Sequence, residues 1–109
     1  MNQLSHQARH CIEECWRCHS ICLSMAMIHC LEMGGEHVKP QHFRLMTDCA
    51  AVCATTADRL AHKSQFHRQI CVLCVEVCTA CANDCMTLDG MEECIAACFT
   101  CAEACREMT

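Results

Sequence analysis

The sequence predicts an all-α protein, an antiparallel up-down-up-down four-helix bundle with a cysteine-lined core. Three observations predict this fold. The chain of 109 residues contains only 3 glycines and 1 proline, and these fall where connections are needed. Between them the chain is rich in Ala, Met, Glu, Gln and Leu, which favour helix. Its 16 cysteines recur at steps of four and three residues, which is the spacing of one face of a helix.

We expect one domain over residues 1–109, and its first two helices are separated by a clear break. The first helix is expected at about residues 5–33. It is followed by the pair Gly34–Gly35 and then by Pro40, residues that favour a turn. The second helix is expected at about residues 40–63.

The boundary between the second and third helices carries neither glycine nor proline. A single helix over residues 40–88 would be about 70 Å long and could not fold back to bury its own seam. We therefore expect a tight turn near Ser64, which is also a possible N-cap, and a third helix at about residues 64–88. The Asp89–Gly90 pair marks the next break.

The fourth helix is expected at about residues 91–108. Asp89 is its expected N-cap, because Glu92 follows three residues later and completes a capping-box pattern. With short connections throughout, the four helices form an up-down bundle.

Three of the expected helices share the motif C-x3-C-x2-C-x3-C. At about 100° per residue, four cysteines spaced in this way stay within roughly 60° of one another on the helix surface. They occupy seam positions that Leu or Ile would fill in an ordinary bundle, so a column of sulfur is expected along the axis. The motif cysteines are Cys11, Cys15, Cys18, Cys22, Cys74, Cys78, Cys81, Cys85, Cys94, Cys98, Cys101 and Cys105.

The remaining cysteines extend this pattern or depart from it. Cys71 lengthens the row of the third helix, and Cys49 and Cys53 form the shorter row of the second helix. Cys30 is expected to one side of the seam of the first helix. Cysteine is a small filler for an axial position, so a column of thiols leaves space, and space lined by sulfur predicts a bound metal.

Composition excludes several functions. The net charge is −5 and no basic run is present, so nucleic-acid binding is not expected. No apolar run reaches the roughly 18 residues that cross a membrane. The first ten residues, MNQLSHQARH, lack the apolar region of a secretory signal. We therefore expect a cytoplasmic protein, in which thiols are kept reduced, and not a disulfide framework.

Iron–sulfur binding is a weaker alternative. The fragments Cys15-x2-Cys18 and Cys98-x2-Cys101 resemble pieces of a ferredoxin motif. However, the only proline, Pro40, follows no cysteine, whereas the ferredoxin run ends in Cys-Pro. Ferredoxin cysteines also lie in loops, and these cysteines lie within expected helices.

Zinc and Cu(I) both favour thiolate ligands, and buried charge distinguishes them. A zinc ion with four thiolates carries a net charge of −2, and repeating such sites along a closed bundle is costly. A Cu⁺ that replaces a thiol proton leaves the charge unchanged. Thiolates that bridge neighbouring ions could then hold on the order of sixteen Cu⁺. Multiple Cu(I) ions per chain are therefore the expected ligand.

The two ends of the column differ. The ends of the first and third expected helices and the starts of the other two share one face, where imidazole and thioether groups predict a His/Met-rich end through which Cu(I) enters. The candidate ligands there are His29, Met33, His42 and Met46, beside Cys30, Cys85, His37, Met86 and Met91. At the opposite end Leu60 is expected to act as a plug, and His67 is interpreted as an ordinary exposed residue.

These motifs resemble the bacterial four-helix-bundle copper storage proteins, specifically their cytosolic branch. The resemblance covers essentially the whole chain and rests on the three cysteine-rich helices, the Cys49-x3-Cys53 pair and the His/Met-rich end. It implies many Cu(I) ions bound by thiolates, no enzymatic activity and a homotetramer. Copper ions are the expected partner, and a copper chaperone is a candidate for exchanging them. The expected function is thus storage and buffering of Cu(I). The alternatives are a general thiolate metal buffer that includes zinc, and an iron–sulfur or thiol-redox protein.

Overall fold

The computed structural model describes residues 4–109, which form helices joined by turns and contain no strand. Residues 1–3 of the expected domain lie outside the described residues. The elements in order are α1 His6–Ser24, the π-helix η1 Met25–Cys30, α2 Leu31–Met33, the 3₁₀-helix η2 Gly35–Val38, α3 Pro40–Ala61, α4 His67–Cys85 and α5 Glu92–Arg106.

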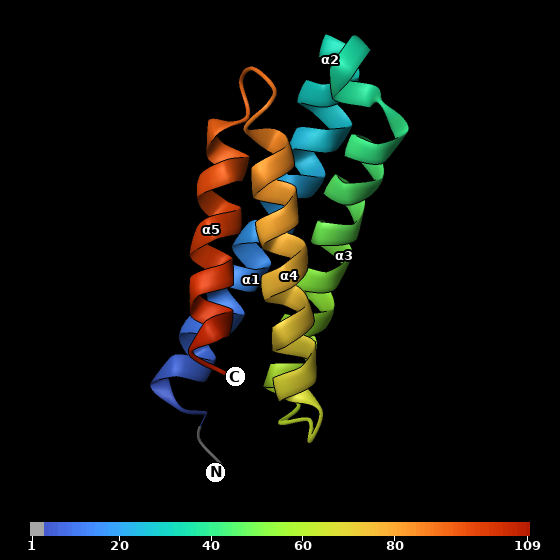
Figure 1. Ribbon diagram of the computed structural model, residues 1–109. Helices are drawn as coiled ribbons and strands as arrows, with labels where there is room; N and C mark the ends of the chain where they lie inside the picture. The colour runs from blue at the N-terminus through green and yellow to red at the C-terminus, as the bar shows by residue number, and fades with distance from the viewer. Residues whose placement is uncertain (1–3) are drawn as a thin grey trace.

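The four long helices run alternately up and down along one axis (Figure 1). The bundle measures 49 × 20 × 18 Å. Helix α1 packs beside α3 and α5, and α4 packs beside the same two helices, so α1 and α4 are diagonally opposite. The four-helix fold expected from the sequence is confirmed. None of the described helices has both the length and the apolar character needed to cross a bilayer.

Helix α1 begins and ends at residues suited to those positions. The hydroxyl of Ser5 accepts a hydrogen bond from the backbone N–H of Ala8 at 3.0 Å, which caps one of the free N–H groups of the first turn. The helical run that starts as α1 continues through η1 and α2 to Gly34, where φ is 65°. Glycine adopts this conformation without steric cost, and the chain can then turn toward α3.

The π-helix at Met25–Cys30 overturns two expectations about the seam. In a π-helix each hydrogen bond spans five residues, so one extra residue enters the turn. The axis side of η1 is therefore taken by Ala26 and Cys30, both with no exposed surface. The expected position of Cys30 beside the seam is wrong, because its thiol faces the core. The expected position of Met33 on the seam is also wrong, because its side chain is 53% exposed.

The turn between α3 and α4 lies at residues 62–66, with Lys63 in a left-handed conformation (φ 55°). The expected N-cap Ser64 does not cap α4, whose N-cap residue is Phe66. The Ser64 hydroxyl instead accepts a hydrogen bond from the backbone N–H of Phe66 at 3.1 Å. Its side chain therefore stabilises the turn, and α4 begins three residues later than the sequence predicts.

The turn between α4 and α5 is held by histidines and not by the expected capping box. The N-cap residue of α5 is Met91, and no side chain caps this helix, so the expectation for Asp89 and Glu92 is wrong. The backbone carbonyl of Asp89 instead accepts hydrogen bonds from the Nε2 of His37 at 2.9 Å and of His29 at 3.3 Å. Two residues from the α1–α3 connection thereby hold the α4–α5 turn in place.

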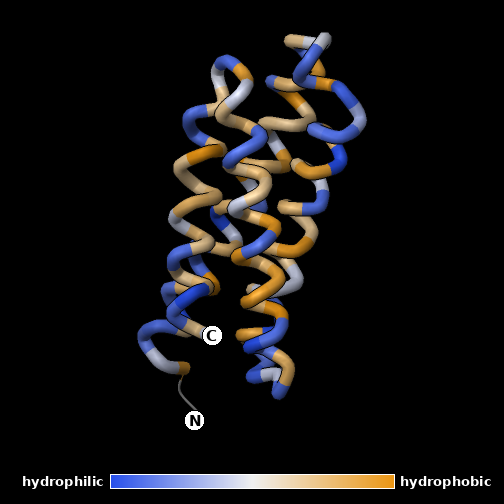
Figure 2. Tube along the Cα trace, in the orientation of Figure 1, coloured by the Kyte–Doolittle hydropathy of each residue, from blue (hydrophilic) through white to orange (hydrophobic). Residues whose placement is uncertain are grey.

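The core is built from small side chains. The buried residues are mostly cysteine and alanine, and Met46, Met91 and Leu60 are the only larger apolar side chains buried among residues 4–109. Hydrophobic and hydrophilic positions alternate along each helix, and the connections at both ends are largely hydrophilic (Figure 2). The thiols therefore occupy the centre of the bundle, and its surface carries polar side chains together with several exposed large apolar ones, among them Trp16, Ile28 and Phe66.

The turn at Gly90 gives a first prediction, with Gly35 as its control. Gly90 has a φ of 76°, and a Cβ there would lie 2.8 Å from the Cε1 of His29. Gly35 has a φ of 54° and no atom within 4 Å of such a Cβ. Gly35→Ala is expected to lower the free energy of unfolding by about 1–2 kcal/mol, the cost of a left-handed alanine. Gly90→Ala is expected to lower it by about 1 kcal/mol more, because the ring of His29 must give up its hydrogen bond.

Urea unfolding of the two variants measures this difference. Equal losses of stability in the two variants would show that the contact between His29 and the turn contributes nothing.

Candidate metal site

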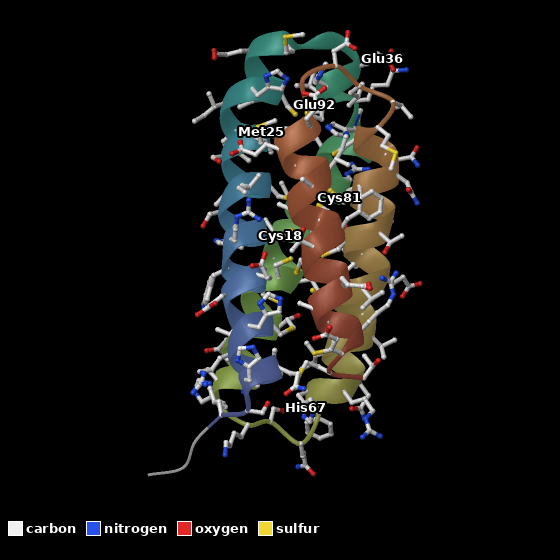
Figure 3. The ribbon with its side chains drawn as sticks, turned by 90° about the vertical axis from the view of Figure 1, so that its left-hand side faces the viewer. Cys18, Met25, Glu36, His67, Cys81 and Glu92 are labelled. Carbon is white, nitrogen blue, oxygen red and sulfur yellow. The ribbon has the colours of Figure 1, made fainter. Side chains whose placement is uncertain are left out.

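The candidate site is a column of thiols along the bundle axis. All sixteen cysteines are buried, and each is a free thiol. The seam cysteines of α1, α3, α4 and α5 point inward, because the four-three-four spacing keeps them on one face of each helix. The labelled Cys18 and Cys81 lie in the interior between the helices (Figure 3). Neighbouring Sγ atoms in this column lie as close as 3.3 Å, the separation of Cys22 from Cys94.

Sulfur contacts continue without a break along most of the bundle. Each step of the path joins two sulfur atoms no more than 3.8 Å apart. The path runs Cys11, Cys105, Cys15, Cys101, Cys53, Cys78, Cys49, Cys98, Cys22, Cys94 and Met46. The thioether of Met46 also lies 3.4 Å from the thiol of Cys85. A soft metal ion could therefore move along the column by exchanging one sulfur neighbour for the next.

The thiols also form groups of four that share members. Within each group all Sγ atoms lie within 4.8 Å of one another. Eight cysteines each belong to two of the five groups named below: Cys18, Cys22, Cys49, Cys53, Cys74, Cys78, Cys98 and Cys101. The groups include Cys15–Cys74–Cys101–Cys105, Cys53–Cys74–Cys78–Cys101, Cys18–Cys49–Cys53–Cys78, Cys18–Cys22–Cys49–Cys98 and Cys22–Cys81–Cys94–Cys98. Because one sulfur serves two groups, metals in adjacent groups would have to share bridging thiolates.

Burial and neighbouring thiols raise the pKa of several individual cysteines and keep them protonated. Burial raises the pKa of the Cys30 thiol, and the nearby Cys94 and Cys81 raise it further. Hydrogen bonds with Cys18, Cys22 and Cys49 raise the pKa of Cys98, and burial acts in the same direction. A metal that binds these thiols as thiolates must therefore displace their protons.

The His/Met-rich end carries a mixed set of donors. The Nε2 of His42 lies 3.6 Å from the thiol of Cys30, which in turn lies 4.0 Å from the thioether of Met91. The Nδ1 of His42 lies 2.5 Å from a carboxylate oxygen of Asp84. A carboxylate that accepts from one ring nitrogen fixes the tautomer and leaves the other nitrogen free for a metal. His42 is 4% exposed, and its Nε2 faces the column.

At this end some of the candidate ligands named from the sequence are buried in the core and others lie nearer the surface. The structure brings Cys30, His42 and Met46 to the core, where all three are buried. His29 is half-buried and bonds the Asp89 carbonyl. Met33 is exposed, whereas Cys30, His42 and Met46 are buried, so Met33 is a poor candidate for a metal site that these three residues form.

A small hollow of about 150 Å³ leads from the surface to His42. It is lined by Glu36, Lys39, Gln41, His42, Asp84, Thr87 and Leu88. Figure 3 places the labelled Glu36 at this end of the bundle. The imidazole of His42 lines the hollow. Its ring centroid lies 6.5 Å from that of His37, which lies 5.3 Å from that of His29. This end therefore offers nitrogen donors close to the surface and sulfur donors beneath them.

Asp84 was missed from the sequence. It lies on α4, one residue before the seam position Cys85, and nothing in the local sequence distinguishes it from a surface acid. Met91 and His37 were placed at this end without a role. The proximity of Met91 to Cys30 depends on the π-helix, which the sequence does not signal.

Comparisons with known proteins identify relatives over almost the whole chain. A family model described as copper storage protein matches residues 4–109. The cysteine-rich protein YhjQ of Bacillus subtilis (strain 168), described as uncharacterized, is 38% identical over 100 residues, which cover 90% of this chain and 92% of that protein.

Solved structures show the same fold. The crystal structure of the protein Nmul_A1745 from Nitrosospira multiformis is 48% identical, with a TM-score of 0.92, and 94% of each chain is covered. The Cu(I)-bound copper storage protein BsCsp3 is 36% identical with a TM-score of 0.85, covering 94% of this chain and 98% of that chain. Apo-Csp3 from Bacillus subtilis is 37% identical with a TM-score of 0.77, covering 93% and 97%.

The raised thiol pKa values predict how the stability of the metal-free protein depends on pH. A cysteine in the unfolded chain titrates near about pH 8.5, whereas Cys30 and Cys98 stay protonated to higher pH in the folded state. Below pH 8.5 both states are protonated, so this contribution to stability is fully present. Above it the unfolded state loses protons first, so the contribution of these two thiols to the free energy of unfolding is expected to fall as pH rises.

Urea unfolding of the reduced apo-protein between pH 7 and pH 10 measures this dependence. A free energy of unfolding that rises over this range would contradict the assignment of neutral buried thiols.

Proposed function

The chain belongs to the copper storage protein family, and we propose that its buried column of thiols holds many Cu(I) ions as shared thiolate clusters. The observation that carries this proposal is the unbroken series of sulfur contacts from Cys11 to Met46. The proposed ligands are Cys11, Cys15, Cys18, Cys22, Cys30, Cys49, Cys53, Cys71, Cys74, Cys78, Cys81, Cys85, Cys94, Cys98, Cys101, Cys105, His42 and Met46.

Buried charge favours Cu(I) over a divalent metal. Among residues 4–109 the only buried polar or charged side chains are His37, His42 and Thr56, so no buried lysine or arginine offsets an anionic cluster. Each Cu⁺ that displaces one thiol proton leaves the column neutral. A series of zinc sites with four thiolates each would place several net negative charges in the core, at a cost of several kcal/mol per charge.

The sharing of sulfur atoms also argues against separate zinc sites. A structural zinc ion takes four ligands of its own in a tetrahedron. Here Cys18 and Cys49 belong to the same two groups of four, so two zinc ions in those groups would compete for both ligands. Thiolates that bridge Cu(I) ions can serve both groups at once.

The His/Met-rich end is the proposed way in. An ion that reaches the hollow meets His42, then Cys30 and Met91, and then the thioether of Met46 at the top of the thiol column. Thioether needs no deprotonation, so Met46 can bind an arriving ion without releasing a proton. Thiolates bind Cu(I) more strongly than thioether or imidazole, so the ion is expected to pass from these donors to the cysteines. His29 is proposed as an outer donor and Met33 as at most a surface donor.

The proposed role is storage and buffering without an enzymatic step. We propose that the protein acts in the cytoplasm, where its thiols stay reduced, and that it exchanges copper with a copper chaperone. The family resemblance further supports a homotetramer. Bound copper links all four helices and is therefore expected to stabilise the fold.

Anaerobic titration of the reduced apo-protein with Cu(I) against a chromophoric chelator tests the storage proposal. We expect tight binding of more than about ten Cu(I) per chain, because bridging thiolates let sixteen thiols bind a similar number of ions. A parallel titration with Zn(II) is expected to show fewer and weaker sites. Saturation at one or two copper ions would overturn the proposal.

Asp84 gives a test of the way in, with Asp58 as a matched control. Both carboxylates contact a histidine Nδ1, Asp84 at 2.5 Å from His42 and Asp58 at 3.5 Å from the exposed His62. Asp84→Ala is expected to slow the initial rate of Cu(I) loading by about tenfold, because His42 loses the carboxylate that orients it. The final capacity is expected to stay the same.

Stopped-flow measurement of chelator absorbance gives the loading rate. Asp58→Ala is expected to load like the wild type. Equal rates in the two variants would show that His42 is not on the path of the ion.

A further inference from the structure

A cavity opens at the end of the bundle opposite His42, beside the α3–α4 turn. Its volume is about 480 Å³, which is within the range of small-molecule sites. Figure 3 places the labelled His67 at this end, away from Glu36 and Glu92. The cavity is lined by Leu4, Ser5, Ala8, Leu60, Lys63, Ser64, Gln65, His67 and Met108.

One layer of side chains separates this cavity from the thiol column. Helices α1 and α4 each place a lining residue about one turn before their first thiol, and the turn after α5 places a third lining residue three positions after Cys105. These pairs are Ala8 with Cys11, His67 with Cys71 and Met108 with Cys105. One helical turn rises about 5.4 Å, so a copper ion held by the last thiols would lie close to the floor of the cavity.

The floor combines a plug with two soft donors. Leu60 and Ala8 are 3% and 6% exposed, so they close the axis with apolar groups. His67 and Met108 are half-buried beside them. The Nδ1 of His67 donates to the backbone carbonyl of Ser64 at 3.1 Å, which leaves its Nε2 free to bind a metal.

We propose that this cavity is a second copper port, at which a small thiol that carries carboxylates removes Cu(I) from the last thiols of the column. The proposal rests on the proposed storage function. Lys63 lines the cavity and supplies a cation for a carboxylate of the incoming thiol. Leu60 is the gate, since its side chain closes the axis between the cavity and the thiols Cys11, Cys71 and Cys105.

The transfer is an exchange of ligands with no change in oxidation state. The sulfur of the incoming thiol bonds to Cu(I), and the bond from Cu(I) to a terminal cysteine sulfur breaks. The proton of the incoming thiol passes to the cysteine thiolate that leaves, which becomes a neutral thiol. His67 and Met108 can hold the ion between the two sulfurs during the exchange. Once every bond from the ion to a cysteine sulfur has been exchanged in this way for a bond to an incoming thiol, the copper leaves as a Cu(I)–thiolate complex.

Transfer of copper from the loaded protein to glutathione tests this port. Leu60→Ala is expected to raise the initial transfer rate by about tenfold, equivalent to a barrier lower by about 1.4 kcal/mol. The matched control is Leu45→Ala, which truncates a leucine that packs against the core outside the lining of this cavity and is expected to leave the rate within twofold. Leu60→Val replaces Leu60→Ala if the larger truncation does not fold.

Charge at the cavity gives a second readout. Lys63→Glu is expected to slow transfer to glutathione, because the carboxylates of glutathione would meet a like charge. Transfer to 2-mercaptoethanol, a neutral thiol, is expected to be unchanged. A rate that Lys63→Glu lowers equally for both thiols would contradict a carboxylate site.

Alkylation of the apo-protein separates the failure of this port from the failure of storage. With iodoacetamide and peptide mapping, the first thiols modified in Leu60→Ala are expected to be Cys11, Cys71 and Cys105. Unchanged transfer in Leu60→Ala would overturn the port and leave storage intact. A wild-type protein that loads only one or two copper ions would overturn storage, and the alkylation map would still decide whether Leu60 gates access.

Discussion

The contact of one cysteine sulfur with another, repeated along the bundle axis, is the interaction on which the rest of the structure depends. Thiols are small and form only weak hydrogen bonds, so the axis supplies little of the packing that Leu or Ile would give. The aliphatic side chains lie at the flanks of the core instead, where Ile12, Val52, Val75 and Ile95 are partly buried against it. In the metal-free bundle these flanking aliphatic side chains supply much of the apolar packing, and the thiols on the axis stay available to bind metal.

The seam could be predicted because periodicity alone determines it. The four-three-four spacing places Cys15, Cys18 and Cys22 on one face whatever the neighbouring helices are. The position of Cys30 could not be predicted, because one extra residue in a π-helix changes the face of everything after it, and the residues at Met25–Cys30 do not signal such a turn. The hydrogen bond between His42 and Asp84 could not be predicted either, because it joins α3 to α4 and produces no periodic pattern in the sequence of either helix.

The connections show the same limit. The break near Ser64 was predicted from the length that an unbroken helix would have, and the chain does turn there, but the capping residue is Phe66. Asp89 matched the sequence pattern of an N-cap, yet its backbone carbonyl has the larger role because His29 and His37 donate to it. Local propensity identifies where a turn falls, and tertiary contacts decide which atoms hold it.

The shared groups of thiols have a consequence for how such a protein can change its size. One repeat of the four-three spacing covers seven residues, or about two helical turns, so seven residues added to every helix would lengthen the bundle by about 10.5 Å. The added stretch would contribute its own thiols and would join the existing ones through bridging sulfurs, while the cross-section stayed the same. Capacity would then be a linear function of helix length, and the number of ions carried could be adjusted by insertion or deletion without redesign of any single site.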